Sequence, residues 1–186
     1  MAEIIVVTGG ARSGKSSLAE EKAKELGNKV VYIATAIAFD DGMKDRISKH
    51  KASRPSTWAT IERYKKFNEL ERSQDFNESD LILLDCMTLM VSNNLLESDV
   101  DLDTCSMKDI EHIEKNILNE VKELLEIVTR NEKKLIIVTN EVGMGLVPSY
   151  RLGNIFRDIA GRVNQYLANQ AQEVYYTVSG IPLKIK

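Results

Sequence analysis

The sequence predicts an α/β fold, a three-layer sandwich built on a mostly parallel β-sheet. Short apolar runs rich in β-branched residues alternate with segments of helical periodicity, as in chains that place helices on both faces of a sheet. The apolar runs are continuous, which indicates strands buried on both faces. A turn sequence and one more short apolar segment follow the last run. They predict an antiparallel edge strand at the C-terminal end of the sheet.

The strands are predicted at the apolar runs themselves. In chain order these cover residues 4–7, 30–34, 81–84, 135–138 and 174–178. The turn Ser179-Gly180-Ile181-Pro182 then leads to a short strand over residues 183–186, beside the fifth run. Since adjacent strands joined by a tight turn run antiparallel, this last strand alone is expected to oppose the others.

The helices are predicted at residues 15–26, 107–130 and 154–171. The first ends at Gly27, a residue type favoured just after a helix. The second begins after Ser106, with Asp109 placed to complete a capping box, and its apolar residues form one stripe. Two polar stretches, residues 68–80 and 93–104, are expected to be exposed loops or frayed helix ends.

Composition favours one soluble domain over residues 1–186. Hydrophobic residues make up 43% of the 186 and charged residues 28%, and no repeat or linker divides them. A net charge of −3 argues against a nucleic-acid partner or an anionic-membrane partner, which need a basic field. Two cysteines without a C-x-x-C pair and two histidines make a zinc site improbable. No run approaches the roughly 20 apolar residues of a membrane span, and we expect a cytoplasmic protein.

The strongest local signal is a phosphate-binding loop. It consists of Gly9, Gly10, Ala11, Arg12, Ser13, Gly14, Lys15 and Ser16, and it matches G-x-x-x-x-G-K-[ST] in full. Glycines let backbone N–H groups converge on phosphate oxygens, and the following helix adds its positive dipole end. The lysine reaches the β- and γ-phosphates, and the serine hydroxyl can hold Mg²⁺. A strand before it and a helix after it favour this interpretation over a plain turn, and the sandwich is expected to be P-loop NTPase-like.

Asp85 is the expected partner of Ser16 in binding Mg²⁺. It follows the third apolar run directly, so it should lie at the carboxyl edge of the sheet, where open α/β folds bind ligands. The alternative is an aspartate that ends the strand and caps the next helix. A GTPase switch would also need a base-reading N-K-x-D, and the nearest segment, Thr139-Asn140-Glu141-Val142, lacks both the lysine and the aspartate.

His50 supports two interpretations. It lies among Arg46, Lys49, Lys51 and Arg54, just before a proline. If residues 40–51 are helical, His50 shares a face with two apolar residues, which would suit a partly buried core histidine. Otherwise the imidazole faces a phosphate-rich site, where nearby cations keep it neutral and nucleophilic. The residues alone leave these two interpretations equally open.

Several segments together resemble the bifunctional adenosylcobinamide kinase / adenosylcobinamide-phosphate guanylyltransferase family of cobalamin synthesis. The resemblance runs nearly end to end. It rests on residues 7–16, Tyr32-Ile33-Ala34-Thr35, His50 with Arg54-Pro55 and Trp58, residues 139–145, residues 157–165, and Val178-Ser179-Gly180-Ile181. A phosphate loop is widespread, whereas the other segments in combination are specific to this family.

The resemblance implies two reactions and a set of site residues. A nucleoside triphosphate, ATP or GTP, phosphorylates adenosylcobinamide; then GTP transfers GMP to the enzyme, with loss of pyrophosphate, and on to adenosylcobinamide phosphate. The covalent GMP carrier of the family falls on His50, with Lys15 also catalytic. Further nucleotide contacts fall on Ala34, Thr35, Ala36, Lys51, Ala52, Ser53, Arg54, Glu62 and Asp85. The family is trimeric, and a corrinoid needs a wide, partly apolar mouth, for which residues 142–150 are candidates.

Two residues depart from the family pattern. Lys49 stands where some relatives carry a second histidine, and Asp85 stands where an acid longer by one methylene, glutamate, is common. Two other functions remain to be distinguished: a monofunctional P-loop kinase of another small alcohol or nucleotide, and a nucleotide-gated binding module with little turnover. Among the three hypotheses, only the corrinoid enzyme predicts a covalent nucleotide on histidine.

Overall fold

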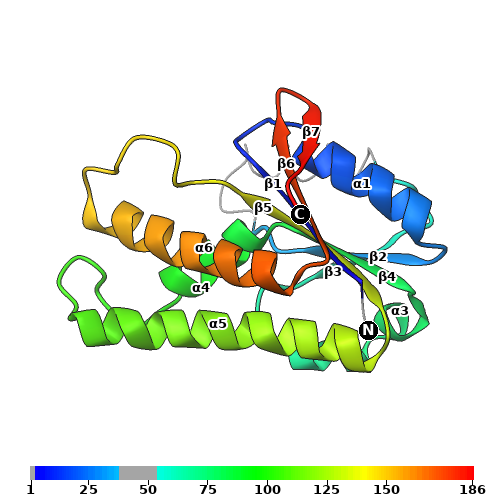
Figure 1. Cartoon of the computed structure of the whole chain (residues 1–186). Coiled ribbons are helices and arrows are strands. Elements are labelled where there is room, and N and C mark those ends of the chain that lie inside the picture. Colours follow the sequence, from blue (N-terminus) through cyan, green and yellow to red (C-terminus); the bar gives the residue numbers. More distant parts are fainter. Residues whose placement is uncertain (1–2, 38–53) are drawn as a thin grey trace.

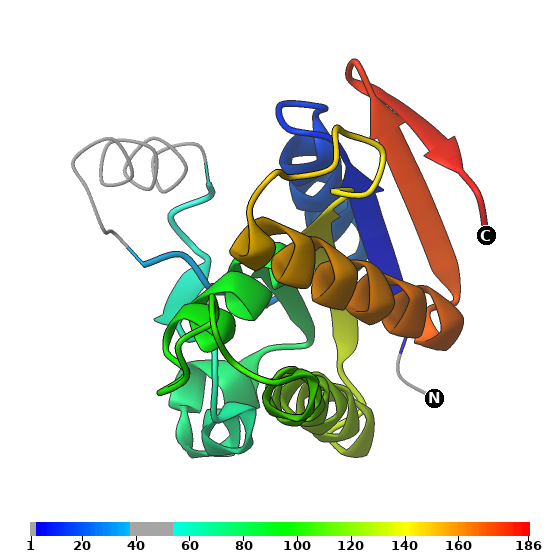
Figure 2. The same cartoon turned by 90° about the vertical axis from the view of Figure 1, so that its left-hand side faces the viewer.

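The computed structural model describes residues 3–37 and 54–186, and these form a single sheet covered by helices on both faces (Figures 1 and 2). The order of its strands is β3-β2-β4-β5-β1-β6-β7, and all pairs are parallel except β6 with β7. The strands are β1 (Ile4–Gly9), β2 (Val30–Ala34), β3 (Ala59–Glu62), β4 (Leu81–Asp85), β5 (Lys134–Asn140), β6 (Glu173–Val178) and β7 (Ile181–Lys184). The predicted α/β sandwich with an antiparallel edge strand is confirmed.

The helices divide unequally between the two faces. They are α1 (Lys15–Leu26), the 3-10 helix η1 (Phe67–Arg72), α3 (Gln74–Glu78), α4 (Met87–Leu96), α5 (Met107–Arg130) and α6 (Arg151–Gln170). In Figures 1 and 2, α1 lies on one face of the sheet, whereas α4, α5 and α6 lie together on the other. We call these the α1 face and the α5 face.

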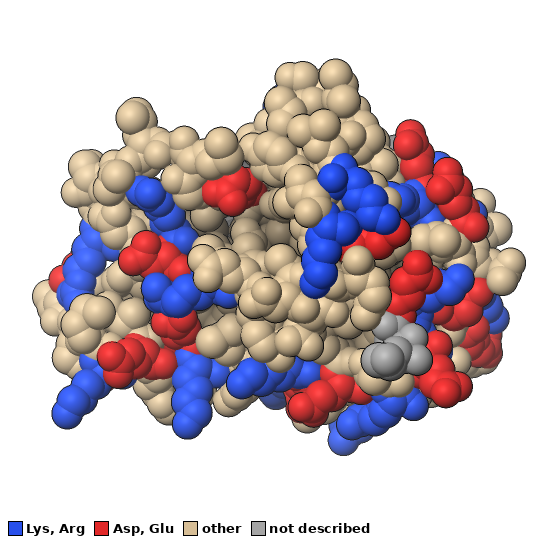
Figure 3. All heavy atoms as spheres, in the orientation of Figure 1, with Lys and Arg blue, Asp and Glu red and all other residues tan. Residues whose placement is uncertain are grey.

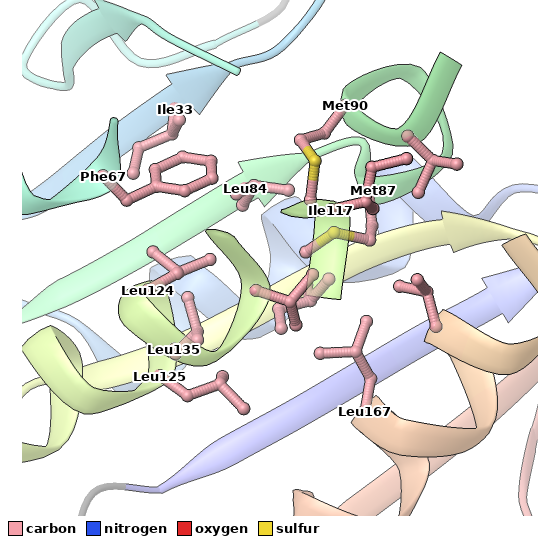
Figure 4. Close-up of a cluster of buried hydrophobic side chains, with 14 of the residues drawn as sticks. Ile33, Phe67, Leu84, Met87, Met90, Ile117, Leu124, Leu125, Leu135 and Leu167 are labelled. Atoms are coloured by element: carbon pink, nitrogen blue, oxygen red, sulfur yellow. The ribbon is translucent and has the colours of Figure 1, made fainter. Parts of the chain in front are cut away.

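The α5 face holds the larger of two cores. Alternate residues of the central strands, such as Ile82 and Leu84, pack there against side chains from the helices. Figure 4 shows Leu84 among them. Leu124 of α5 and Met90 of α4 are fully buried in this cluster. The intervening residues, such as Leu83, pack against α1 in a smaller cluster. This is the double burial that the continuous apolar runs predict.

Both helix-terminus predictions were tested, with different outcomes. At α5, the Ser106 hydroxyl accepts from the Asp109 N–H at 3.3 Å and the Asp109 carboxylate accepts from the Ser106 N–H at 2.9 Å, which confirms the capping box. At α1, the backbone of Gly27 is extended, with φ −111°, so glycine is not needed there for a left-handed turn. A Cβ there would lie 2.8 Å from Val30 and 2.9 Å from Leu81, so glycine is required by close packing instead.

The prediction of exposed loops or frayed helix ends is wrong for residues 68–80 and holds in part for residues 93–104. Residues 68–80 contain most of η1 and all of α3, and Leu70 and Phe76 are buried in the α5-face core together with Phe67. The stretch 93–104 begins inside α4, where Asn93 is 2% exposed. Two further elements were not predicted: β3, whose side chains alternate between half-buried and exposed, and α4, which is apolar around most of its circumference. The alternation of β3 covers only four residues and α4 lacks a polar face, so neither gives a strong local signal.

The observed bounds of two other elements differ from the predicted bounds by a few residues. The last helix starts at Arg151 rather than Asn154, and the edge strand runs over Ile181–Lys184, directly from the turn. Among the described residues no helix is long and apolar enough to cross a membrane.

Candidate functional site

The phosphate loop connects β1 to α1 at the carboxyl edge of the sheet. It turns through two left-handed residues, Arg12 with φ 56° and Gly14 with φ 95°, before α1 begins at Lys15. The N-terminal N–H groups of α1 therefore face the loop, an arrangement suited to binding phosphate. The Lys15 Nζ donates to the Gly10 carbonyl at 2.9 Å, so the ammonium folds back over the loop, within reach of a bound phosphate chain.

The β6–β7 turn braces this loop from its outer side. The Thr177 and Ser13 hydroxyls are 2.8 Å apart, and the Gly180 N–H donates to the Ser13 carbonyl at 2.8 Å. The packing leaves no room for side chains at two glycines. A Cβ on Gly9 would lie 2.5 Å from the Thr177 carbonyl oxygen, and one on Gly14 would lie 3.0 Å from the Gly180 Cα. The Ser13 hydroxyl and carbonyl thus hold the loop in shape.

Asp85 ends β4 on the α1 face of the sheet. It pairs in register with Ala34 of β2, and Ala34 pairs on its other side with Glu62 of β3. Side chains in register point to the same face, so the two predicted acids and Ala34 form one row along the carboxyl edge. Asp85 is half-buried, and the residue before α4 in the N-cap position is Cys86. The alternative of a helix-capping aspartate is therefore wrong.

Thr35 follows Ala34 and is buried, and its hydroxyl, N–H and carbonyl all form hydrogen bonds within the protein. Its hydroxyl accepts from the Cys86 N–H at 2.8 Å and donates to the Cys86 carbonyl at 2.7 Å. Its own N–H donates to the Asp85 carbonyl at 3.3 Å, and its carbonyl accepts from Asn93 at 2.7 Å. Thr35, predicted as a nucleotide contact, fixes the turn that follows Asp85 through these hydrogen bonds. Ala36 follows it and is half-buried.

Cys86 is held in the same turn and is not a reactive thiol. Burial, followed by the charge of Asp85, raises the pKa of its thiol to about 11. A thiol with so high a pKa is protonated at neutral pH and a poor nucleophile.

Arg54 places a cation against the same edge of the sheet. The centre of its guanidinium lies 3.2 Å from the ring centroid of Tyr32, a stacked cation–π geometry. Glu20 of α1 is its ion-pair partner at 4.0 Å, and both side chains are largely buried. Within the described part of the chain, Arg54 Nε and Nη1 are buried without a hydrogen-bond partner. Two N–H donors left in this state are available to an anionic ligand.

Tyr32 links Arg54 to Asp85. Its ring is buried, and burial is the main cause that raises the pKa of its hydroxyl, followed by the negative charge of Asp85. Hydrogen bonding to Asp85 raises this pKa further, whereas the Arg54 charge lowers it. The phenol is thus neutral and sits between the acid and the cation. Residue patterns did not predict this role, because Tyr32 lies in a continuous apolar run.

The structure brings together most of the predicted site. Gly9 to Ser16, Ala34, Glu62 and Asp85 meet at one edge of the sheet with Arg54. Four predicted residues, His50, Lys51, Ala52 and Ser53, lie outside the described residues. His112, expected to be solvated, is exposed on α5. Sequence reasoning did not place Thr177 or Gly180 against the phosphate loop, although Gly180 belongs to the Val178-Ser179-Gly180-Ile181 segment and Thr177 precedes it.

Comparison with known proteins agrees along nearly the whole chain. A family model described as CobU, cobinamide kinase / cobinamide phosphate guanyltransferase, matches residues 5–185. The bifunctional adenosylcobalamin biosynthesis protein CobU of Escherichia coli (strain K12) is 46% identical over 183 residues, which are 98% of this chain and 99% of the relative. The protein of the same name from Salmonella typhimurium is also 46% identical, with the same coverage. CobP of Pseudomonas aeruginosa is 37% identical over 97% of this chain and 96% of its own length.

Proposed function

The chain belongs to the cobinamide kinase / cobinamide phosphate guanyltransferase family, and we propose that its guanylyl transfer proceeds through a covalent GMP bond to His50. The chain is a bifunctional transferase of cobalamin biosynthesis, which phosphorylates cobinamide and transfers a guanylyl group to cobinamide phosphate. This sets aside the monofunctional kinase and the nucleotide-gated binding module.

The observation that carries the proposal is the combination of a braced phosphate loop with a buried, incompletely bonded cation beside it. The loop and Lys15 suit the β- and γ-phosphates of GTP. Arg54, four residues after His50 in the sequence, offers donors to the same nucleotide. A neutral imidazole near such cations is a competent nucleophile toward phosphorus.

The proposed chemistry has two displacements at the α-phosphorus. A nitrogen of His50 forms a bond to this phosphorus, and the bond to the oxygen bridging the α- and β-phosphates breaks, so that pyrophosphate leaves. Lys15 and the loop N–H groups stabilise the charge that develops on the leaving pyrophosphate. A phosphate oxygen of cobinamide phosphate then attacks the same phosphorus, the P–N bond breaks, and the imidazole is restored.

Mg²⁺ fits this arrangement as a companion of the nucleotide. A serine hydroxyl at the start of α1 and the Asp85 carboxylate on the same face of the sheet are the oxygen ligands that Mg²⁺ takes in such sites. Residues 3–37 and 54–186 contain no group of three or more His, Cys, Asp or Glu that would hold a metal unaided. Ser16 and Asp85 would therefore share the ion with phosphate oxygens and water, and the ion supplies charge neutralisation on the phosphates.

The remaining nucleotide contacts are proposed at Lys51, Ala52, Ser53, Arg54 and Glu62. Glu62 lies next to Ala34 in register and could accept from ribose hydroxyls, an acidic role common at this edge of α/β sheets. Either ATP or GTP could supply the phosphoryl group in the kinase step, because the loop recognises phosphates rather than the base.

Assembly as a homotrimer and a cytoplasmic location are further parts of the proposal. The outer strand β7 exposes Ile181 and Leu183, and Ile185 follows it. An exposed apolar edge strand has unpaired backbone N–H and C=O groups, which can pair with another copy of the chain. Cys86 and Cys105 are both unpaired, as in reducing compartments. Light scattering after gel filtration would test the trimer.

The covalent step is tested by the mass of the intact protein after incubation with GTP and Mg²⁺. We expect an acid-labile increment of one GMP, absent with ATP and absent in His50→Ala. A His50→Ala variant that still gains GMP would place the nucleophile elsewhere. A wild-type protein that binds GTP without gaining mass would favour direct transfer.

A further inference from the structure

The loop that follows β5 exposes an unusual number of apolar side chains. Residues 142–150, which we call the apolar loop, contain no charged residue in a chain that is 28% charged. Leu146 is 97% exposed, Met144 78%, Val147 69% and Tyr150 62%. Soluble proteins seldom expose such a group of large apolar side chains together unless the surface binds something.

The apolar loop is fastened beside the phosphate loop. The Glu141 N–H donates to the Gly9 carbonyl at 3.0 Å, at the point where the loop leaves β5. The Glu141 carboxylate accepts from the N–H groups of Gly143 and Met144. The Tyr176 hydroxyl of β6 lies 3.3 Å from the Met144 sulfur. In Figures 1 and 2 the apolar loop, the phosphate loop and the β6–β7 turn share one edge of the molecule.

The far end of the apolar loop is also held. The Asn154 side-chain amide donates to the Pro148 carbonyl at 2.8 Å and to the Tyr150 carbonyl at 3.1 Å, and Arg157 donates to the Gly143 carbonyl at 3.2 Å. These bonds join the loop backbone to α6 while its apolar side chains remain exposed. The loop therefore presents a largely formed surface, which lowers the ordering cost of binding.

We propose that the apolar loop binds the corrin macrocycle of the cobinamide substrate through Met144, Leu146, Val147 and Tyr150. This inference rests on the proposed function, because it assumes that cobinamide and nucleotide meet at the phosphate loop. A corrin ring offers a broad apolar face and a rim of neutral amides, and it must lie beside the nucleotide when its side-chain hydroxyl or phosphate reacts. Figure 3 shows that the upper edge of the molecule carries few charged side chains and has a hollow beneath it.

The position of the loop and the kind of side chains it exposes favour the corrinoid over a second copy of the chain as the occupant. The apolar loop adjoins the phosphate-binding edge, where a substrate must approach, whereas the exposed apolar side chains of β7 and Ile185 lie along an outer strand. Aromatic and thioether side chains adapt well to the curved face of a macrocycle. Docking of another copy on the apolar loop is a distinct outcome of the test.

The test measures binding of adenosylcobinamide directly, by equilibrium dialysis read from its visible absorption. The variant is the double change Leu146→Ser and Val147→Ser, and the control is Leu96→Ser, which alters an apolar residue that is 53% exposed at the end of α4, outside the loop. We expect the double variant to weaken corrinoid binding about tenfold or more, with GTP binding and native mass by light scattering unchanged. The control should bind as the wild type does.

Two results would overturn the proposal. Unchanged corrinoid affinity in the double variant would exclude the loop as the binding surface. Loss of the native assembly with unchanged corrinoid affinity would instead make the loop a contact between copies. Dialysis requires no covalent step, so the result stands even where no GMP forms on His50, and failure of the histidine mechanism is distinguishable from failure of this inference.

Discussion

The two faces of the sheet differ in depth of cover and in what they carry. The α5 face is covered by α4, α5 and α6 together with η1 and α3 and holds the larger core, whereas the α1 face is covered by α1 and holds the smaller cluster. Asp85, Tyr32 and Arg54 all lie on the thinner α1 side. A thin cover leaves the carboxyl edge accessible to a ligand while the opposite face supplies most of the buried apolar area. Stability and chemistry are therefore separable, and substitutions can test this.

The largest effect is expected at the α1 face, from Lys15→Ala. Loss of the ammonium that neutralises the phosphates should lower the rate of GMP transfer about 1,000-fold, or about 4 kcal/mol. The melting temperature should change little, because Lys15 contributes a hydrogen bond rather than core packing. Single-turnover kinetics and thermal melts measure the two quantities. Lys24→Ala, exposed on the same helix, is the control, and a Lys15→Ala protein that unfolds as easily as a core variant would contradict the separation.

The second effect belongs to the α5 face. Leu124→Ala removes a fully buried side chain and should lower the free energy of unfolding by about 2–5 kcal/mol. The protein that remains folded should bind GTP with wild-type affinity. Urea denaturation and nucleotide titration check both statements. Lys115→Ala, exposed on the same helix, should stay within about 0.5 kcal/mol of wild type. Weaker GTP binding in folded Leu124→Ala would show that the faces are coupled.

The third effect tests the brace between β6 and the phosphate loop. Thr177→Val leaves the buried Ser13 hydroxyl without its partner at 2.8 Å, which should cost about 1–3 kcal/mol. Because Ser13 shapes the loop, we expect GTP affinity to fall by about tenfold. Thr177→Ser keeps the hydroxyl and should restore most of it. A Thr177→Val protein that binds GTP with wild-type affinity would show that this hydrogen bond does not shape the loop.

The smallest effect concerns an exposed ion pair on the α5 side. Arg130 and Asn131 donate to Glu71, and they lower the pKa of its carboxyl to about 2. A depressed folded-state pKa gives stability that is present above the ordinary value of 4.5 and is lost as pH falls toward 2. Glu71→Gln should therefore lower the melting temperature slightly at pH 7 and not near pH 2. An equal difference at both values would rule out the charge as its cause.

Much of the fold was predictable because its signals are local. The phosphate loop is readable from eight consecutive residues, and the central strands from continuous apolar runs. The amphipathic helix α5, with its capping box, was predicted to the residue. In contrast, α4 lacks a polar face and the alternation of β3 covers only four residues, so neither element has a strong local pattern. Leu70 and Phe76 were predicted in an exposed polar loop, whereas the structure buries both in the α5-face core.

For the site, the sequence by itself determined which chemical groups are available. It specified the glycines, Lys15 and Ser16 for phosphate, the acid that ends β4, and the histidine proposed to carry GMP. Tertiary structure alone decided what surrounds them. Thr177 and Gly180 contact Ser13 across more than 160 residues of sequence, and Tyr32 meets Arg54 and Asp85 only when β2, β4 and the segment before β3 are adjacent. Contacts between residues so far apart depend on strand order and helix placement, which leave no periodicity in the chain.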